Sequence, residues 1–253
     1  MLFAGTIFVG VDTTAAHKAF TYAALDRDLA VATLGEAEPD ELLDFLGGQK
    51  AAVVAINAPS HLNTGYVRKA SEQSNPRNHN LRGVDLRAAE HALRERGISV
   101  SATSSREGLC PAWVRMGLSL YRSLGASGFQ PYPARECEFQ WVETHPHAAF
   151  CGLLGRNPLS KATVEGRLQR QLVLFERGLR IRDPMDYFEE ITRHRLLSGI
   201  LPSDLVYAPE QLDALVAALT AWVAVEKKSE LSQFGNEEEG FISLPVSSML
   251  EKY

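Results

Sequence analysis

Residues 6–11 (TIFVGV) form a continuous, mostly apolar run rich in β-branched side chains, and the run ends in Asp12. A run of this kind is typical of a central strand that is covered on both faces by helices. Open α/β sheets bind their ligands at the carboxyl ends of their strands. The run therefore predicts an α/β protein in which Asp12 lies at the edge of the sheet that binds ligands.

The residues that follow predict a mixed sheet. Two short runs, 19–25 and 29–34, flank a turn at Asp26, Arg27 and Asp28, so the chain should open with three short meandering strands. A helix over residues 39–46 and a buried strand over 51–56 come next, and such a strand–helix–strand unit favours parallel pairing. We therefore expect three antiparallel N-terminal strands joined to parallel ones.

The remainder of the chain is predominantly helical. Apolar periodicity predicts helices over 85–96, 111–124, 163–176, 185–197 and 209–226, and short strands over 139–142 and 241–244. The polar segment 60–80 is expected to be a surface excursion. Because no repeat or linker interrupts the sequence, we expect a single domain over 1–253. It would have a polar insertion at about 60–80 and helical insertions at about 111–125 and 160–200.

Charge and cysteine content narrow the class of protein. The formal net charge is −5, whereas proteins that bind duplex DNA usually carry a basic face. Basic residues do recur over 156–182, and they form either a solvated helix face or a local phosphate-binding surface. Three scattered cysteines, no basic leader and no long apolar stretch predict a cytoplasmic protein without a disulfide framework or a membrane span.

Four polar residues from distant parts of the chain are candidates for one site. Asp12, Asn57 and Glu143 each end a predicted strand, and Asp213 lies in the first turns of the last long helix. Carboxylate and amide oxygens are preferred ligands of Mg²⁺ and Mn²⁺, and two such ions can assist displacement at phosphorus. The pattern predicts metal-assisted phosphoryl transfer, although each residue is also a common helix cap or turn former.

With these residues in place, the chain resembles the family called domain of unknown function 429 over nearly its whole length. This family is regarded as predicted nucleases of the ribonuclease H-like superfamily. The resemblance rests on short motifs in a fixed order: VGVD (9–12), VVAINAPSHLN (53–63), RAAEHALRERGI (87–98), VETHP (142–146), SKATVEGRLQR (160–170), LDALVAALTA (212–221) and EEGFISLP (238–245).

The resemblance implies a ribonuclease H-like fold with site acids at Asp12, Glu143 and Asp213. It also exposes a departure, because Asn57 stands where the family has the aspartate of an Ile-Asp-Ala-Pro motif. A neutral amide in place of a bridging carboxylate weakens a two-metal site. The protein would then use one metal ion, use a different acid or be catalytically silent.

Basic side chains are candidates for binding phosphate groups of a substrate. Lys161, Arg167 and Arg170 match a basic motif of the family. Arg87 would either hold a phosphate near the site or form a helical i, i+3 pair with Glu90.

Two histidines follow the late strand. If the strand continued through residue 146, His145 and His147 would lie on the same face as Glu143. Histidine is a common transition-metal ligand and acid or base, but either residue would equally suit a strand-to-loop exit.

Three functions follow from these patterns. The first is a metal-dependent nuclease or phosphodiesterase, which would act on nucleic acid or on a phosphorylated small molecule. The second is a catalytically silent binding or assembly protein on the same fold, which Asn57 favours. The third is an actin-like phosphotransferase, suggested by the opening VGVDTTAAHKAF but opposed by the lack of a second copy of the fold. The sequence does not specify an oligomeric state.

Overall fold

A computed structural model describes residues 5–14, 19–74 and 83–253. The last part of the predicted polar insertion, residues 75–80, lies outside these ranges. The strands are β1 (Ile7–Asp12), β2 (Phe20–Leu25), β3 (Val31–Ala37), β4 (Ala52–Asn57), β5 (Gln130–Pro131), β6 (Phe139–Thr144), β7 (Ser232–Asn236) and β8 (Gly240–Leu244). The helices are α1 (Pro39–Gly47), α2 (Tyr66–Ser74), α3 (Ala88–Glu95), α4 (Ala112–Ala126), α5 (Pro146–Leu154), α6 (Val164–Glu176), α7 (Asp186–Glu189), α8 (Arg193–Leu197) and α9 (Pro209–Glu226).

The described strands form one mixed sheet in the order β3-β2-β1-β4-β6-β8-β7, with β5 paired to the first half of β6. β1, β2 and β3 pair antiparallel, whereas β1, β4, β6 and β8 run parallel. The predicted combination of three antiparallel N-terminal strands with parallel strands is confirmed. In this arrangement β1, β4 and β6 end at the same edge of the sheet.

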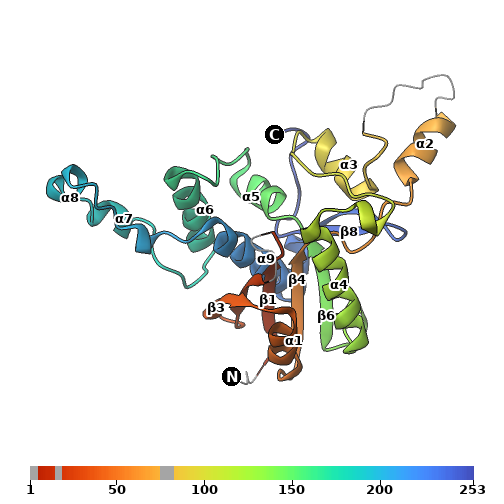
Figure 1. The fold of residues 1–253 in the computed structure, drawn as a ribbon, viewed down its shortest axis with the longest axis horizontal. Helices are drawn as coiled ribbons and strands as arrows, with labels where there is room; N and C mark the ends of the chain where they lie inside the picture. The colour runs from red at the N-terminus through yellow and green to blue at the C-terminus, as the bar shows by residue number, and fades with distance from the viewer. Residues whose placement is uncertain (1–4, 15–18, 75–82) are drawn as a thin grey trace.

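Helices cover both faces of the sheet (Figure 1). One apolar core joins α9, α5 and part of α3 to the sheet, and a second core joins α1 and α4 to its opposite face. β1 is buried at every position, as expected of a central strand between two helical layers. None of the helices in the described ranges is long and apolar enough to cross a membrane.

Most predicted elements are confirmed with shifts of a few residues at their ends, and the helix over 209–226 matches α9. The single helix expected over 185–197 is wrong, because the chain forms two short helices, α7 and α8. The break occurs at Thr192, whose side chain accepts a hydrogen bond from the Arg195 N–H and thereby begins α8. A helix N-cap cannot lie inside a continuous helix.

Four helices and strands were not expected from the sequence: the helix α5, the strands β5 and β7, and the helix α2 inside the polar segment 60–80. α5 is apolar on nearly all sides, so it has no amphipathic stripe to detect. α2 begins beside Glu239, whose carboxylate accepts hydrogen bonds from the N–H groups of Thr64 and Tyr66. A capping group 173 residues away in the sequence leaves no local signal.

Candidate functional site

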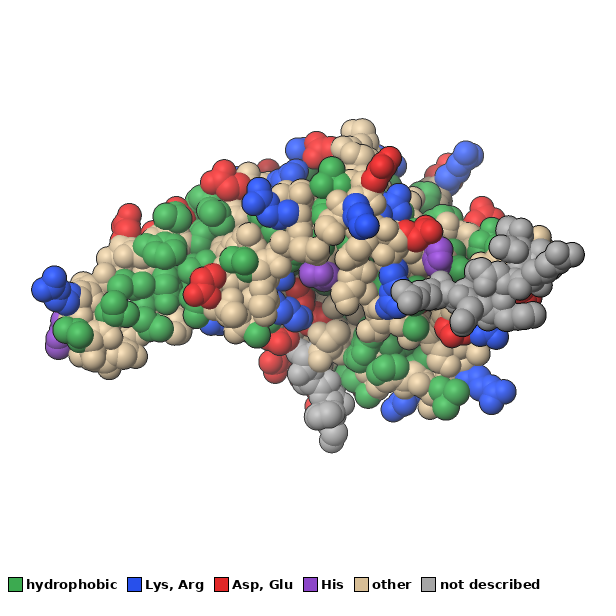
Figure 2. Space-filling view, turned by 90° about the horizontal axis from the view of Figure 1, so that it is seen from above, with side chains coloured by type: hydrophobic (Ala, Val, Ile, Leu, Met, Phe, Trp, Pro, Cys, Tyr) green, Lys and Arg blue, Asp and Glu red, His purple; other side chains and the backbone are tan. Residues whose placement is uncertain are grey.

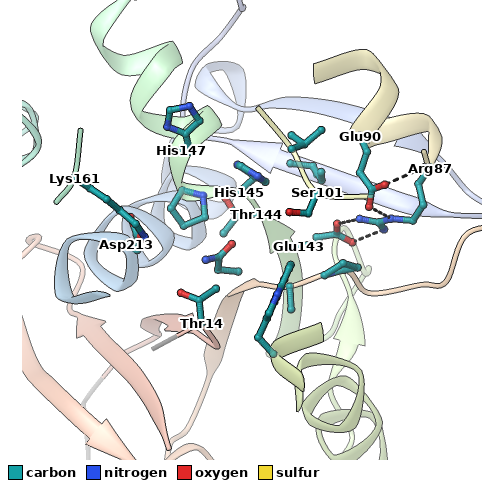
Figure 3. Close-up of a pocket in the computed structure, with 17 residues that line it drawn as sticks. Thr14, Arg87, Glu90, Ser101, Glu143, Thr144, His145, His147, Lys161 and Asp213 are labelled. Atoms are coloured by element: carbon teal, nitrogen blue, oxygen red, sulfur yellow. Dashed lines mark hydrogen bonds and ion pairs between the residues drawn. The ribbon is translucent and has the colours of Figure 1, made fainter. Parts of the chain in front are cut away.

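A cavity of about 280 Å³ opens at the sheet edge where β1, β4 and β6 end. Residues of β4, β6, α5 and α9 line it, together with loop residues such as Thr14 and Lys161. Figure 2 looks onto this side of the molecule, where basic, acidic and histidine side chains surround a hollow. Figure 3 shows that the charged residues lie at two ends of the cavity, with Lys161 and Asp213 at one and Arg87, Glu90 and Glu143 at the other.

Asp12 lies beneath the wall of this cavity at the end of β1 and is fully buried. Asn57 Nδ2 donates a hydrogen bond to its Oδ1 at 2.7 Å, and the Thr14 hydroxyl lies 2.8 Å from its Oδ2. Burial raises the pKa of the Asp12 carboxyl, and the hydrogen bonds from Asn57 and Thr14 offset part of that shift. Asn57 and Thr14 themselves line the cavity and connect Asp12 to it.

Asp213 reaches the same region from α9. A Cβ at Gly10 would lie 2.0 Å from the Ala214 carbonyl oxygen, so only glycine lets α9 cross β1 this closely. Asp213 is 4% exposed, and Lys161 Nζ donates to its Oδ2 at 2.6 Å. Burial raises the pKa of Asp213 to about 6, the ammonium of Lys161 opposes that shift, and the charge of Asp12 adds to it. We call Asp12, Asp213 and Lys161 the lysine cluster.

The two histidines do not continue β6. Pro146 is the first residue of α5, and His145 is its N-cap, where Nδ1 accepts a hydrogen bond from the Ala148 N–H. The neutral ring therefore carries its proton on Nε2. Burial and the nearby charge of His147 lower the pKa of His145 to about 4, so the ring is an uncharged donor at neutral pH. Both histidines line the cavity (Figure 3).

Glu143 is held by a different set of partners. Its Oε2 accepts hydrogen bonds from the backbone N–H and the hydroxyl of Ser60, both at 2.7 Å. The guanidinium of Arg87 donates to both Glu143 oxygens. Nε of Arg87 also pairs with Glu90 at 2.8 Å, and Glu90 accepts from Thr103. We call Arg87, Glu90 and Glu143 the arginine cluster.

The basic residues expected to contact phosphate lie in different environments. Lys161 is on the cavity wall, and its side chain is 47% exposed. Arg170 is buried, and it donates to the carbonyl oxygens of Leu159 and Gly166 within its own helix and loop. Arg87 is 1% exposed within the arginine cluster. Arg167 is half-buried and does not line this cavity. Of the four, Lys161 and Arg87 line the cavity, and Lys161 alone is exposed there.

The structure thus brings Asp12, Asn57 and Asp213 to one region and binds Glu143 into another. In the described ranges, no group of three His, Cys, Asp or Glu side chains is placed to hold a metal ion. Sequence reasoning did not identify Thr14, Ser60 or Glu239 as partners of the site residues. The Asp12-Thr13-Thr14 sequence could have signalled the first, because threonine after a carboxylate commonly folds back onto it.

Comparison with known proteins gives one match. Residues 10–239 match the model of a family described as "Protein of unknown function (DUF429)". No curated protein and no solved structure matches the chain.

Proposed function

The chain belongs to the DUF429 family, and because the description of that family states no activity, we propose a function from the site itself: hydrolysis of a phosphate ester in a small anionic substrate. One Mg²⁺ or Mn²⁺ ion would be held between Asp12 and Asp213. One observation carries the proposal. Two buried carboxylates from β1 and α9 lie at the sheet edge; the ammonium of Lys161 donates a hydrogen bond to Asp213, and the charge of Arg170 also acts on Asp213.

The donor set of the lysine cluster fits one hard cation. Burial raises the pKa values of Asp12 and Asp213, so their charged forms are costly in the folded protein, and a divalent ion bound between them would stabilise those charged forms. Nδ2 of Asn57 is used in the bond to Asp12, which leaves its amide oxygen as a further ligand. Mg²⁺ is commonly bound through one or two carboxylates together with water and substrate phosphate.

The remaining residues of the cavity suit an anionic ester. In hydrolysis a water oxygen forms a bond to phosphorus, the bond from phosphorus to the ester oxygen breaks, and the leaving oxygen takes up a proton. When bound, the cation would supply charge stabilisation for the phosphate oxygens. The ammonium of Lys161 would bind the same phosphate, and the Nε2–H of His145 would donate to it without adding charge.

A small substrate fits the distribution of charge better than a long nucleic acid. Proteins that bind nucleic acid neutralise several phosphates with exposed lysines and arginines. Here the guanidinium groups of Arg87 and Arg170 are buried in other contacts, and among the basic residues that line the cavity Lys161 is the exposed one. We therefore place phosphorylated small molecules ahead of nucleic acid as substrates.

Calorimetric titration with Mn²⁺ tests the proposal, followed by assays of p-nitrophenyl phosphate, bis-p-nitrophenyl phosphate and an oligonucleotide. Wild type should bind Mn²⁺ and hydrolyse a small ester, Asp12→Ala should lose both properties, and Asn57→Asp should bind Mn²⁺ more tightly. Circular dichroism of each variant controls for folding.

Absence of Mn²⁺ binding in the wild type would overturn the proposal. Binding that appears only in Asn57→Asp would favour the alternative of a catalytically silent protein on the same fold. The neutral Asn57 and the fully paired Glu143 are the observations that support this alternative.

A further inference from the structure

Residues 182–206 form an excursion between α6 and α9, which we call the apolar arm. In Figure 1, α7 and α8 of this arm project away from the body of the protein. Gln171 of α6 joins the two ends of the arm at its base, and its side chain is fully buried. Its carboxamide donates hydrogen bonds to the carbonyl oxygens of Arg182 and Leu205, both at 3.0 Å. The Arg182 guanidinium also donates to the Asp204 carbonyl. Both ends of the arm are therefore joined by hydrogen bonds.

A small apolar cluster stabilises the base of the arm. Tyr187 packs with Leu168 of α6 and with Val206, and each of the three is less than a tenth exposed. The arm is therefore a folded part of the molecule, and its orientation is fixed where it leaves the body.

The outer part of the arm is apolar but uncovered. Half of the exposed large apolar side chains in the described ranges lie on it: Met185, Phe188, Leu196, Leu197, Ile200 and Leu201. Leu197 is 82% exposed and Leu196 is 60% exposed. Figure 2 shows apolar side chains gathered over this projecting end of the molecule. Contiguous apolar surface of this kind marks an interaction site.

The charges on the arm identify the partner. Asp186 and Glu189 of α7 are exposed and form no ion pair with the described part of the chain. Arg193 of α8 is likewise exposed and forms no ion pair with that part of the chain. In a two-fold symmetric contact the same surface pairs with itself, so residue i meets residue j and j meets i. If α7 of one copy lies against α8 of the other, Arg193 meets Asp186 and Glu189 twice.

A lipid surface would require a different charge balance. Anionic membranes attract segments with an excess of lysine and arginine. The apolar arm instead contains five acidic residues and three arginines, so its charge opposes such binding. From the exposed apolar end and the self-complementary charges we propose that the apolar arm is the contact of a two-fold symmetric homodimer.

Sedimentation equilibrium of the whole chain tests the homodimer at loading concentrations up to ~100 µM. We expect a dimer in the wild type and a dissociation constant at least about a hundredfold weaker in Leu196→Glu/Leu197→Glu. The matched control is Leu109→Glu, because Leu109 is 71% exposed but lies outside the arm; this variant should dimerise like the wild type.

A charge exchange distinguishes a second copy from any other partner. Arg193→Glu and Asp186→Arg/Glu189→Arg should each dimerise weakly alone, because each places like charges together. Mixed in equal amounts they should form a heterodimer, because both contacts then join opposite charges. A wild type that is monomeric throughout, a Leu196→Glu/Leu197→Glu variant that remains dimeric, or a mixture that fails to associate would overturn the proposal. None of these outcomes depends on Mn²⁺ binding or hydrolysis.

Discussion

Each end of the cavity has two buried carboxylates and one basic side chain, but the two ends differ in how those carboxylates are hydrogen-bonded. In the arginine cluster, the carboxylate of Glu143 accepts from both terminal guanidinium nitrogens of Arg87 and twice from Ser60. In the lysine cluster, Lys161 donates to Asp213, the charge of Arg170 also acts on Asp213, and burial raises the pKa of both carboxyls. At the first end the basic side chain donates hydrogen bonds to both carboxylates, whereas at the second Lys161 donates to Asp213, and Asp12 accepts from the neutral Asn57 and Thr14.

This difference indicates what each cluster contributes. A buried ion pair whose hydrogen bonds are all made fixes the positions of the elements that contain it, here β6 and the start of α3. Carboxylates whose pKa is raised by burial cost stability when they are charged, and such costs are characteristic of functional sites. Changes to the arginine cluster should therefore act on stability, and changes to the lysine cluster should act on cation binding.

Glu143→Gln should have the largest effect. The substitution removes the negative charge from a pair with 1% and 2% exposed side chains and leaves the guanidinium of Arg87 with Glu90 alone. Breaking a buried pair in this way costs about 3–5 kcal/mol. Urea denaturation should show this loss as a lower midpoint. Mn²⁺ affinity of the folded variant should stay as in the wild type.

The exposed ion pair of Arg68 and Asp85 provides the control, because its side chains are 55% and 75% exposed. Asp85→Asn should cost no more than about 1 kcal/mol. If Glu143→Gln unfolded at the wild-type midpoint and lost Mn²⁺ binding, Glu143 would belong to the functional end of the cavity, and the comparison between the two clusters would fail.

Asp213→Asn should stabilise the folded protein at neutral and higher pH, by less than Glu143→Gln destabilises it. Burial raises the pKa of Asp213 from 3.8 to about 6. Below pH 3.8 the carboxyl is protonated in both states and has no effect on stability. Between pH 3.8 and 6 the unfolded chain loses this proton first, so the folded wild type is progressively destabilised, and above pH 6 the loss is complete. At about 1.4 kcal/mol per pKa unit the loss is at most about 3 kcal/mol.

The variant has no such carboxyl, so it should match the wild type near pH 4 and be more stable by about 1–3 kcal/mol at pH 8. Urea unfolding between pH 4 and pH 8 measures the difference. As control, Asp40→Asn replaces an exposed carboxylate in the first turn of α1 and should preserve the wild-type pH dependence. An Asp213→Asn protein that is less stable than the wild type at pH 8 would mean that Lys161 neutralises Asp213 completely.

Much of the fold could be predicted because its signals are local. The buried run of β1, the turn between β2 and β3 and the 18-residue run of helix-forming residues in α9 each lie within or beside the element that they specify. α5 is also buried on nearly all sides, but with 9 residues it is too short to be recognised from composition, although Pro146 at its first position was a usable signal. Tertiary burial removes the pattern from which helices are recognised.

The site could be predicted only in part, for a similar reason. The prediction that Asp12 and Asn57 each end a strand correctly made them neighbours, because β1 and β4 are parallel and pair these two residues. The sequence could not show that the Glu143 carboxylate already accepts hydrogen bonds, because the donors Arg87 and Ser60 are 56 and 83 residues away. Charge compensation in the interior depends on long-range contacts, so residue type and position alone do not separate a structural carboxylate from a functional one.

Lys161→Gln should have the smallest effect in free energy, and it tests directly whether the cation binds beside Asp213. The ammonium lies 2.6 Å from Asp213 Oδ2 and competes there with any bound cation. Its removal should tighten Mn²⁺ binding about tenfold, or about 1.4 kcal/mol, and slow hydrolysis of a phosphate ester, because the substrate loses its cationic partner. Lys50→Gln, at an exposed lysine before β4, should change neither property. Unchanged Mn²⁺ affinity in Lys161→Gln would place the cation away from Asp213, and the lysine cluster would then be a second structural ion pair, comparable to that of Arg87 and Glu143.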